Sequence, residues 1–363
     1  MNELKTEQIT SFQLNALLIL FLLGSTVVAG LGLDVGTDAW IVTIISSQIG
    51  IGLLYFYMMF FLKFQLNFAT LLIKGFGKYL GKTLVFFYIL YFLYIASRVV
   101  KDFSYFIAQV LFYEIEYYLI TLTFIALTSY ACYLGIEAIS RTTEILFFLT
   151  IVIIFFIILF SIISNQVELS NLFPLFSGNW RGIFQSLFPE RVTFPYGELI
   201  VFTFIFPLIN KKKSLFKRTW IVIPITAFIM FSLTELTIGL LGPKMSSLYI
   251  FPLAEAIELI QIGDVIQHLE ILSTVVFFFV GFVKISLFLQ AALYSAQTLV
   301  PVKPKMILLI FAPCLIIMSI LNSTNLSQHL YYGLNIVPLL VHIPFQFIIP
   351  LLLFVILSLK NIQ

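Results

Sequence analysis

The sequence predicts an all-α polytopic membrane protein with ten transmembrane helices, of which the first and the sixth are interrupted. Two features of the composition predict this class: 61% of the 363 residues are hydrophobic, and only 10% are charged. Soluble domains carry about 25% charged residues, and a single water-soluble core stops growing near ~250 to 300 residues. The mean hydropathy of +1.09 therefore excludes an ordinary soluble enzyme and requires a lipid bilayer as the solvent.

Ten segments are long and apolar enough to cross a bilayer, whose ~30 Å hydrocarbon core needs about 20 helical residues. They run roughly over residues 12–33, 38–62, 83–110, 117–136, 142–164, 190–210, 217–241, 268–298, 306–322 and 333–358. Asp34 and Asp38 follow the first segment in place of a small-residue cleavage site, so we expect this segment to stay in the mature protein. Residues 1–363 are expected to form a single integral membrane domain.

The distribution of basic residues predicts the orientation. Most Lys and Arg lie at the termini or in the loops that follow the even-numbered segments, so both termini are expected in the cytoplasm. The outer connections 168–188 and 245–262 are long and mix aromatic with polar residues. We expect both to lie at the membrane interface, either as a gate over an outer vestibule or as passive surface helices.

Several chemistries find no support in the sequence. The net charge of +3 is small, so nucleic acid is not expected as a partner. Cys132 and Cys314 lie in apolar runs, and no His, Cys or carboxylate cluster has metal-ligand spacing. Walker A and Gly-Xaa-Ser-Xaa-Gly motifs are absent from the sequence. We therefore predict no catalytic residue, no metal and no cofactor, and a membrane-embedded enzyme is the weakest alternative.

Glycine and proline interrupt the first and the sixth segment. The first contains GSTVVAGLG, and the sixth contains TFPYGE. Proline removes a backbone donor and glycine adds backbone freedom, so unwound backbone is expected here, although a kink or a small-residue packing seam would leave the same pattern. The residues expected at these breaks are Gly24, Ser25, Thr26, Gly30, Pro195, Tyr196, Gly197 and Glu198.

The two breaks are five helices apart, which places them in two halves of inverted orientation. Corresponding interruptions in inverted halves indicate a binding site at the bilayer midplane. Freed amides could hold a carboxylate and freed carbonyls an ammonium, so an α-amino acid is the simplest ligand; a sugar or an inorganic ion could use the same groups.

Four ionisable residues lie at membrane depth, where each charge costs ~2.5 to 3.5 kcal/mol and needs a partner or a role. Arg98 and Asp102 are one turn apart and either pair within their helix or serve a vestibule or gate. Glu198 either accepts a ligand ammonium, carries a proton, or bonds the freed amides of its own helix. Lys284 either replaces a coupling cation, carries a proton, or is a counter-ion to Glu198.

The sequence resembles the endospore germination permease family, the B subunits of spore germinant receptors, within the amino acid, polyamine and organocation transporter superfamily. The residues that carry the resemblance are GTDAW (36–40), FPYGE (194–198), the FPLAEAIELIQIGDVIQHLEIL stretch (251–272) and FVKISLFLQAALYSAQ (282–297). Where the family suggests a basic residue before IGD, this chain has Glu258.

The resemblance implies a five-plus-five inverted repeat, with the first repeat at about 10–165 and the second at about 190–358. It also implies a germinant pocket at Gly24, Ser25, Thr26, Gly30, Pro195, Gly197 and Glu198, with Arg98 and Lys284 nearby. The implied partners are an amino acid or similar germinant and the A and C subunits of a receptor in the spore inner membrane. A proton-coupled amino acid symporter and a conduit for solutes or ions released during germination are the alternatives.

Overall fold

A computed structural model of the chain describes residues 8–30, 32–110, 116–209, 219–261, 268–323 and 325–360. Within these ranges the fold is helical, and the β-type pairing is one isolated bridge between Ile9 and Ile209. The helices of the first half are α1 (Ser11–Ala29), η1 (Leu33–Asp38), α2 (Ala39–Phe64), α3 (Phe68–Phe76), α4 (Lys78–Val110), α5 (Tyr117–Leu134) and α6 (Ile136–Ile163).

The remaining helices include several short 3-10 and π-helical pieces. They are η2 (Leu169–Leu172), α7 (Trp180–Ser186), η3 (Leu187–Tyr196), η4 (Gly197–Phe204), η5 (Phe206–Leu208), α9 (Val222–Leu241), α10 (Pro243–Ser246), α11 (Pro252–Glu258), α12 (Glu270–Leu299), α13 (Pro304–Leu321), α14 (Leu326–Tyr331), η6 (Tyr332–Ile336), η7 (Pro338–Ile348) and α15 (Ile349–Leu359).

Eight helical stretches in the described residues are long and apolar enough to cross a membrane. Each of them overlaps one of the ten segments expected from the sequence. The other two expected segments, 12–33 and 190–210, are those in which regular α-helix is interrupted: α1 has non-helical backbone at Gly24, and η3 to η5 contain π and 3-10 turns. The all-helical membrane fold is thus confirmed.

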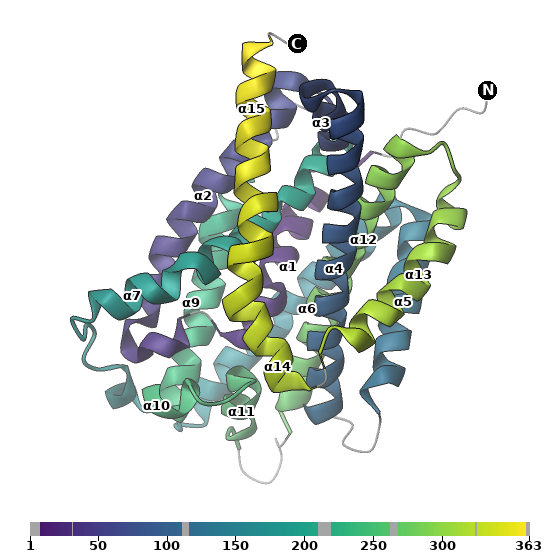
Figure 1. Cartoon of the computed structure of the whole chain (residues 1–363). Coiled ribbons are helices and arrows are strands. Elements are labelled where there is room, and N and C mark those ends of the chain that lie inside the picture. The colour runs from purple at the N-terminus through teal and green to yellow at the C-terminus, as the bar shows by residue number, and fades with distance from the viewer. Residues whose placement is uncertain are drawn as a thin grey trace.

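The helices form one bundle with α1 near its centre (Figure 1), and large apolar side chains remain exposed on the outer helices. α1 is enclosed on all sides, since Leu14, Leu17, Leu20 and Phe21 are each 0% exposed, and it packs against α6, α9 and α12. A helix that is apolar all round is stable only inside a protein or in lipid. α6 meets the second condition, because large apolar residues such as Phe155 remain exposed on it.

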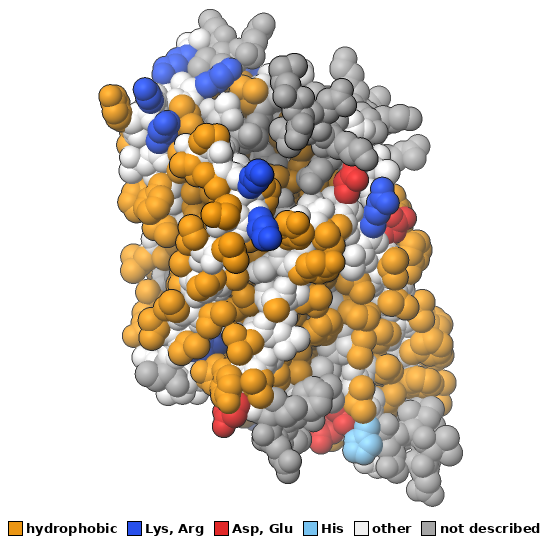
Figure 2. Space-filling model, turned by 90° about the vertical axis from the view of Figure 1, so that its right-hand side faces the viewer, with side chains coloured by type: hydrophobic (Ala, Val, Ile, Leu, Met, Phe, Trp, Pro, Cys, Tyr) orange, Lys and Arg blue, Asp and Glu red, His pale blue; other side chains and the backbone are white. Residues whose placement is uncertain are grey.

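The two ends of the bundle differ in charge. The C-terminal end of α15 lies beside α3, where Lys360 Nζ donates to Gly75 O (2.7 Å) and Lys63 Nζ donates to Ser358 Oγ (2.8 Å). Figure 2 shows Lys and Arg side chains gathered toward that end of one face, apolar side chains over the middle, and acidic side chains with a histidine at the far end. The amphipathic helix α3 was not expected from the sequence, in which residues 63–82 were treated as the connection between two spans.

The first outer connection is bound to the link between α1 and α2. Asp38 accepts hydrogen bonds from the backbone N–H (2.8 Å) and the hydroxyl of Ser177. Trp40 Nε1 donates to Leu175 O (2.8 Å), and Ser186 Oγ donates to Asp34 Oδ1 (2.9 Å). The segment 173–186 is therefore docked on the protein by specific polar contacts.

Candidate ligand-binding site

The break in α1 is formed by Gly24 and closed by the neighbouring threonine. Gly24 has φ −16° and ψ −116°, and a Cβ at this position would lie 2.7 Å from Cδ of Lys284. Thr26 Oγ1 donates to the carbonyls of Leu22 (2.8 Å) and Leu23 (3.0 Å). The carbonyls that the break frees are therefore bonded within the chain, and the lysine stem of α12 fills the space beside the glycine.

The second break lies at Phe194, directly after a threonine whose hydroxyl bonds two preceding carbonyls. Phe194 is extended (φ −131°, ψ 121°), as expected for a residue that precedes proline. Thr193 Oγ1 donates to the carbonyls of Pro189 (3.0 Å) and Glu190 (2.9 Å). The Gly197 N–H donates to Val192 O, so this amide is already paired.

Gly197 is also held from the outside by α2 and η7. Tyr57 Oη donates to Gly197 O (3.1 Å) and lies 2.9 Å from Gln346 O. A Cβ on Gly197 would lie 2.0 Å from Oε1 of Gln346, so the close approach requires glycine here. Gln346 Nε2 donates to Tyr91 Oη (2.9 Å), and Tyr91 Oη lies 3.1 Å from His342 Nδ1. A buried polar network thus joins the break to α4 and η7.

An ion pair connects the two breaks. Lys284 Nζ lies 2.6 Å from Oε2 of Glu198, with 0% and 3% of the two side chains exposed. The ammonium also lies 4.4 Å from the centre of the Phe194 ring and 5.3 Å from that of Phe21. Of the alternatives for Lys284, the structure shows a counter-ion to Glu198. The faces of the Phe194 and Phe21 rings add a cation–π contribution to the stabilisation of its ammonium.

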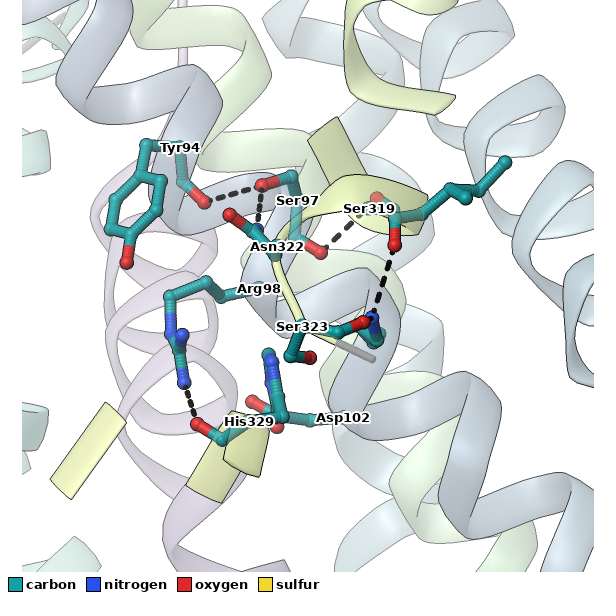
Figure 3. Close-up of polar contacts among 10 residues, drawn as sticks. Tyr94, Ser97, Arg98, Asp102, Ser319, Asn322, Ser323 and His329 are labelled. Carbon is teal, nitrogen blue, oxygen red and sulfur yellow. Dashed lines mark hydrogen bonds and ion pairs between the residues drawn. The ribbon is translucent and has the colours of Figure 1, made fainter. Parts of the chain in front are cut away.

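Arg98 and Asp102 do not form the intrahelical ion pair that their spacing allows, because both contact His329 of α14 (Figure 3). Arg98 donates to His329 O (2.7 Å), and Asp102 Oδ1 lies 2.8 Å from His329 Nε2. Nearby, Lys101 Nζ donates to Ser323 O (2.7 Å), and Asn322 Nδ2 donates to Ser97 Oγ (2.9 Å). These contacts hold one face of α4 against the connection between α13 and α14. Of the two alternatives for Arg98 and Asp102, the intrahelical ion pair is not formed in the described residues.

A cavity opens between α4, the second break and the segment from α14 to η7. The centre of a water molecule can reach about 80 Å³ of it. Its polar lining residues are Arg98, Asp102, Glu190, Glu198 and His342. Its apolar lining includes Ile95, Val99, Phe194, Phe251, Leu330 and Leu334. Glu190 is paired with Arg191 Nη1 (2.9 Å), as Glu198 is with Lys284.

The structure divides the residues expected at the site into two groups. Arg98, Asp102 and Glu198 line the cavity just described. Thr26 and Gly30 line a second and much smaller one of about 10 Å³ together with Pro252 and residues of α9. The side chain of Ser25 lies outside the part of the chain that the structure describes.

Three residues of the TFPYGE stretch that were expected at the site, Pro195, Tyr196 and Gly197, line neither of these two cavities. Pro195 and Tyr196 are buried, and the Tyr196 ring packs on Gly50 of α2, where a Cβ would lie 2.3 Å from Cδ1. Gly24 and Lys284 lie behind Glu198 rather than in the lining.

Sequence reasoning missed Glu190, His329, His342 and Gln346 as residues of the site. A histidine or an amide inside an apolar span was the available signal for His342 and Gln346, whereas His329 lies between two predicted spans.

Comparison with known proteins agrees with the resemblance predicted from the motifs. A family model described as "Spore germination protein" matches residues 8–328. The chain is 30% identical over 346 residues to Spore germination protein KB of Bacillus subtilis (strain 168), which covers 95% of this chain and 93% of that protein.

Among solved structures, the chain is similar to the crystal structure of MhsT in complex with L-phenylalanine. The TM-score is 0.59 at 12% identity, and the similarity covers 96% of this chain and 97% of the MhsT chain. At this identity the likeness concerns the fold alone. The chain belongs to the spore germination protein family, the germination permeases, and is an integral multi-pass membrane protein of the spore inner membrane.

Proposed function

We propose that this chain is the ligand-sensing membrane subunit of a germinant receptor, which binds an amino acid or a similar small nutrient and triggers germination. The observation that carries the proposal is the cavity at the second helix break, lined by Arg98, Asp102 and Glu198. Ionisable residues inside a membrane protein mark functional sites by default, and here three of them face one space.

The proposed trigger is a shift between two packings of the bundle. The cavity is bounded by α4 on one side and by the break and the α14–η7 segment on the others, so a ligand contacts elements that can move relative to one another. A ligand shifts such an equilibrium only by the difference in its affinity for the two states. We propose that the bound nutrient favours the state that partner subunits read.

Germination of spores that carry single variants tests the proposal. Gly197→Ala places a methyl against Gln346 Oε1, whereas Gly52→Ala on α2 is a matched control, since nothing lies within 4 Å of a Cβ there. Glu198→Gln removes the cavity carboxylate, and the exposed Glu116→Gln is its control. We expect both site variants to abolish the nutrient response while the protein remains in the membrane. A normal response over a full nutrient titration would refute the site.

The buried Lys284–Glu198 pair favours a second candidate, a proton-coupled amino acid symporter in which one of these groups carries the proton. Uptake of labelled amino acid by proteoliposomes under a pH gradient, lost in Lys284→Ala, would support it. Binding without uptake supports the receptor. Membership of a permease family with a transporter-like fold favours either function over an enzyme.

We also propose the number and arrangement of the membrane spans and the partners of the protein. We propose ten spans in one membrane domain, arranged as inverted repeats of about 10–165 and 190–358 with cytoplasmic termini. The matched breaks at Gly24 and Phe194, each closed by a threonine that donates to two preceding carbonyls, support this repeat. The proposed partners are the germinant, the A and C subunits and the lipid bilayer.

A further inference from the structure

Arg98 is a buried cation that lines the cavity and has no carboxylate partner among the described residues. Lys101 is also buried without a carboxylate partner in those residues, but it donates to the carbonyls of Ser323 (2.7 Å) and Ile320 (3.4 Å) and lies outside the cavity lining.

Lys284 and Arg191 have carboxylate oxygens at 2.6 and 2.9 Å, whereas no ion pair within 4.0 Å involves Arg98 in the described residues. Its one hydrogen bond there runs from Nη2 to His329 O, and the face of Tyr94 lies 6.0 Å away. Only 8% of Arg98 is exposed, and it lines the cavity.

The space around the guanidinium is specific to this side chain. A Cβ on Gly333, which also lines the cavity, would lie 2.1 Å from Nη2 of Arg98. Glycine at this position therefore lets the guanidinium reach the start of η6. The group carries five N–H donors in a planar fork, and that fork matches the two oxygens of a carboxylate.

An uncompensated charge at this depth is costly, and an anionic ligand removes the cost. At the second helix break, the Gly197 amide already donates to Val192 O and is therefore not available to an anion. Asp102, one turn along α4 from Arg98, and Glu198 of η4 also line this cavity, and their carboxylates can accept hydrogen bonds from a cationic group. A ligand that satisfies both needs carries one negative and one positive group.

The remaining wall of the cavity is apolar, with Ile95, Val99, Phe251, Leu330 and Leu334. A polar ligand side chain placed against these residues would lose its hydrogen bonds to water without replacement. We propose that Arg98 is the anion-binding residue of the receptor and that the ligand is an α-amino acid with an apolar side chain. This inference depends on the proposed function and adds to it the class of ligand and its anchor.

Calorimetric binding to the full-length protein in nanodiscs tests the inference without mutation. The probes are L-alanine, L-valine, L-leucine and L-phenylalanine, the α-carboxamide of each, and D-glucose. We expect at least one amino acid to bind and its carboxamide to bind about 10- to 100-fold more weakly, since hydrogen bonds to a charged group contribute about 1.5–3 kcal/mol. Equal binding of acid and amide, binding of glucose alone, or binding of no probe would overturn the inference.

Variants then assign the effect to Arg98. Arg98→Gln is expected to bind acid and amide equally weakly, and Arg98→Lys to retain part of the preference; Arg141→Gln, at an exposed arginine of α6, is the control and should match the wild type. Full discrimination in Arg98→Gln would refute the role of this residue. If Glu198→Gln abolishes binding while acid and amide bind the wild type equally, the proposed site stands and the present inference fails.

Discussion

Lys284 Nζ of α12 and Glu198 Oε2 of η4 lie 2.6 Å apart in a region from which solvent is excluded, with the Phe194 ring 4.4 Å from the ammonium. The pair ties the restart of the sixth span to the helix that packs along α1 and α4. Because the stem of Lys284 also fills the space at Gly24, one side chain contacts both helix breaks.

Lys284→Met is expected to destabilise the protein strongly, because it leaves the Glu198 carboxylate buried without its counter-ion. Loss of one partner of a buried pair typically costs about 3–5 kcal/mol, whereas removal of both charges is often near neutral. Thermal unfolding in detergent should therefore show a large loss in Lys284→Met and a partial recovery in Lys284→Met with Glu198→Gln. A double variant less stable than the single one would contradict the pairing.

Gly50→Ala is expected to disturb the TFPYGE segment from a distance. The added methyl would lie 2.3 Å from the ring of Tyr196, a rigid neighbour that has to shift, whereas Gly52→Ala two residues away meets nothing within 4 Å. Overpacking of this kind costs about 1–3 kcal/mol. Gly50→Ala should lower both the melting temperature and the nutrient response, and equal behaviour of the two variants would count against the observed packing of Tyr196.

His329→Ala should weaken the contact between α4 and α14, since it leaves the Asp102 carboxylate without its imidazole partner. An unsatisfied partly buried acceptor costs about 1–3 kcal/mol. His268→Ala is the control, because His268 also contacts a carboxylate, that of Glu270 at 2.9 Å, but 74% of its side chain is exposed. Denaturant unfolding that ranks the two variants in the opposite order would exclude a stabilising role for His329.

Glu255→Gln on α11 should stabilise the protein at neutral pH. Burial, and then repulsion from Glu258, raise the pKa of Glu255 above its ordinary value. A carboxyl whose pKa is higher in the folded than in the unfolded state makes stability fall as the pH rises from the ordinary value through the raised one. Melting temperatures between pH 4 and pH 8 should therefore decline less in Glu255→Gln than in the wild type. Glu116→Gln, at an exposed site, should follow the wild type.

The sequence predicted the helical spans well because hydrophobicity and length are local properties. Eight predicted spans coincide with long apolar helices, and the two interrupted ones fall where glycine and proline were recognised. The short helix α3 was missed because its nine residues are too few to cross a bilayer, although their apolar residues recur with clear helical periodicity. The intrahelical Arg98–Asp102 pair, one of two alternatives, is not formed, because Arg98 donates to the carbonyl of His329, which lies 231 positions away. Spacing along one helix cannot indicate a contact with a residue so far along the chain.

The sequence by itself determined that this protein lies in a membrane, where its helix breaks fall and to which family it belongs. Composition, the backbone properties of glycine and proline, and short motifs decide these three features, and each can be read without knowledge of the tertiary structure. Only the tertiary structure decided which charges are paired. Glu198 pairs with Lys284, and Asp102 contacts His329. Arg98 lines the cavity and forms no ion pair within 4.0 Å with a carboxylate of the described residues. These outcomes depend on side chains that α4, η4, α12 and α14 bring together, and electrostatic energy depends on their separation in space.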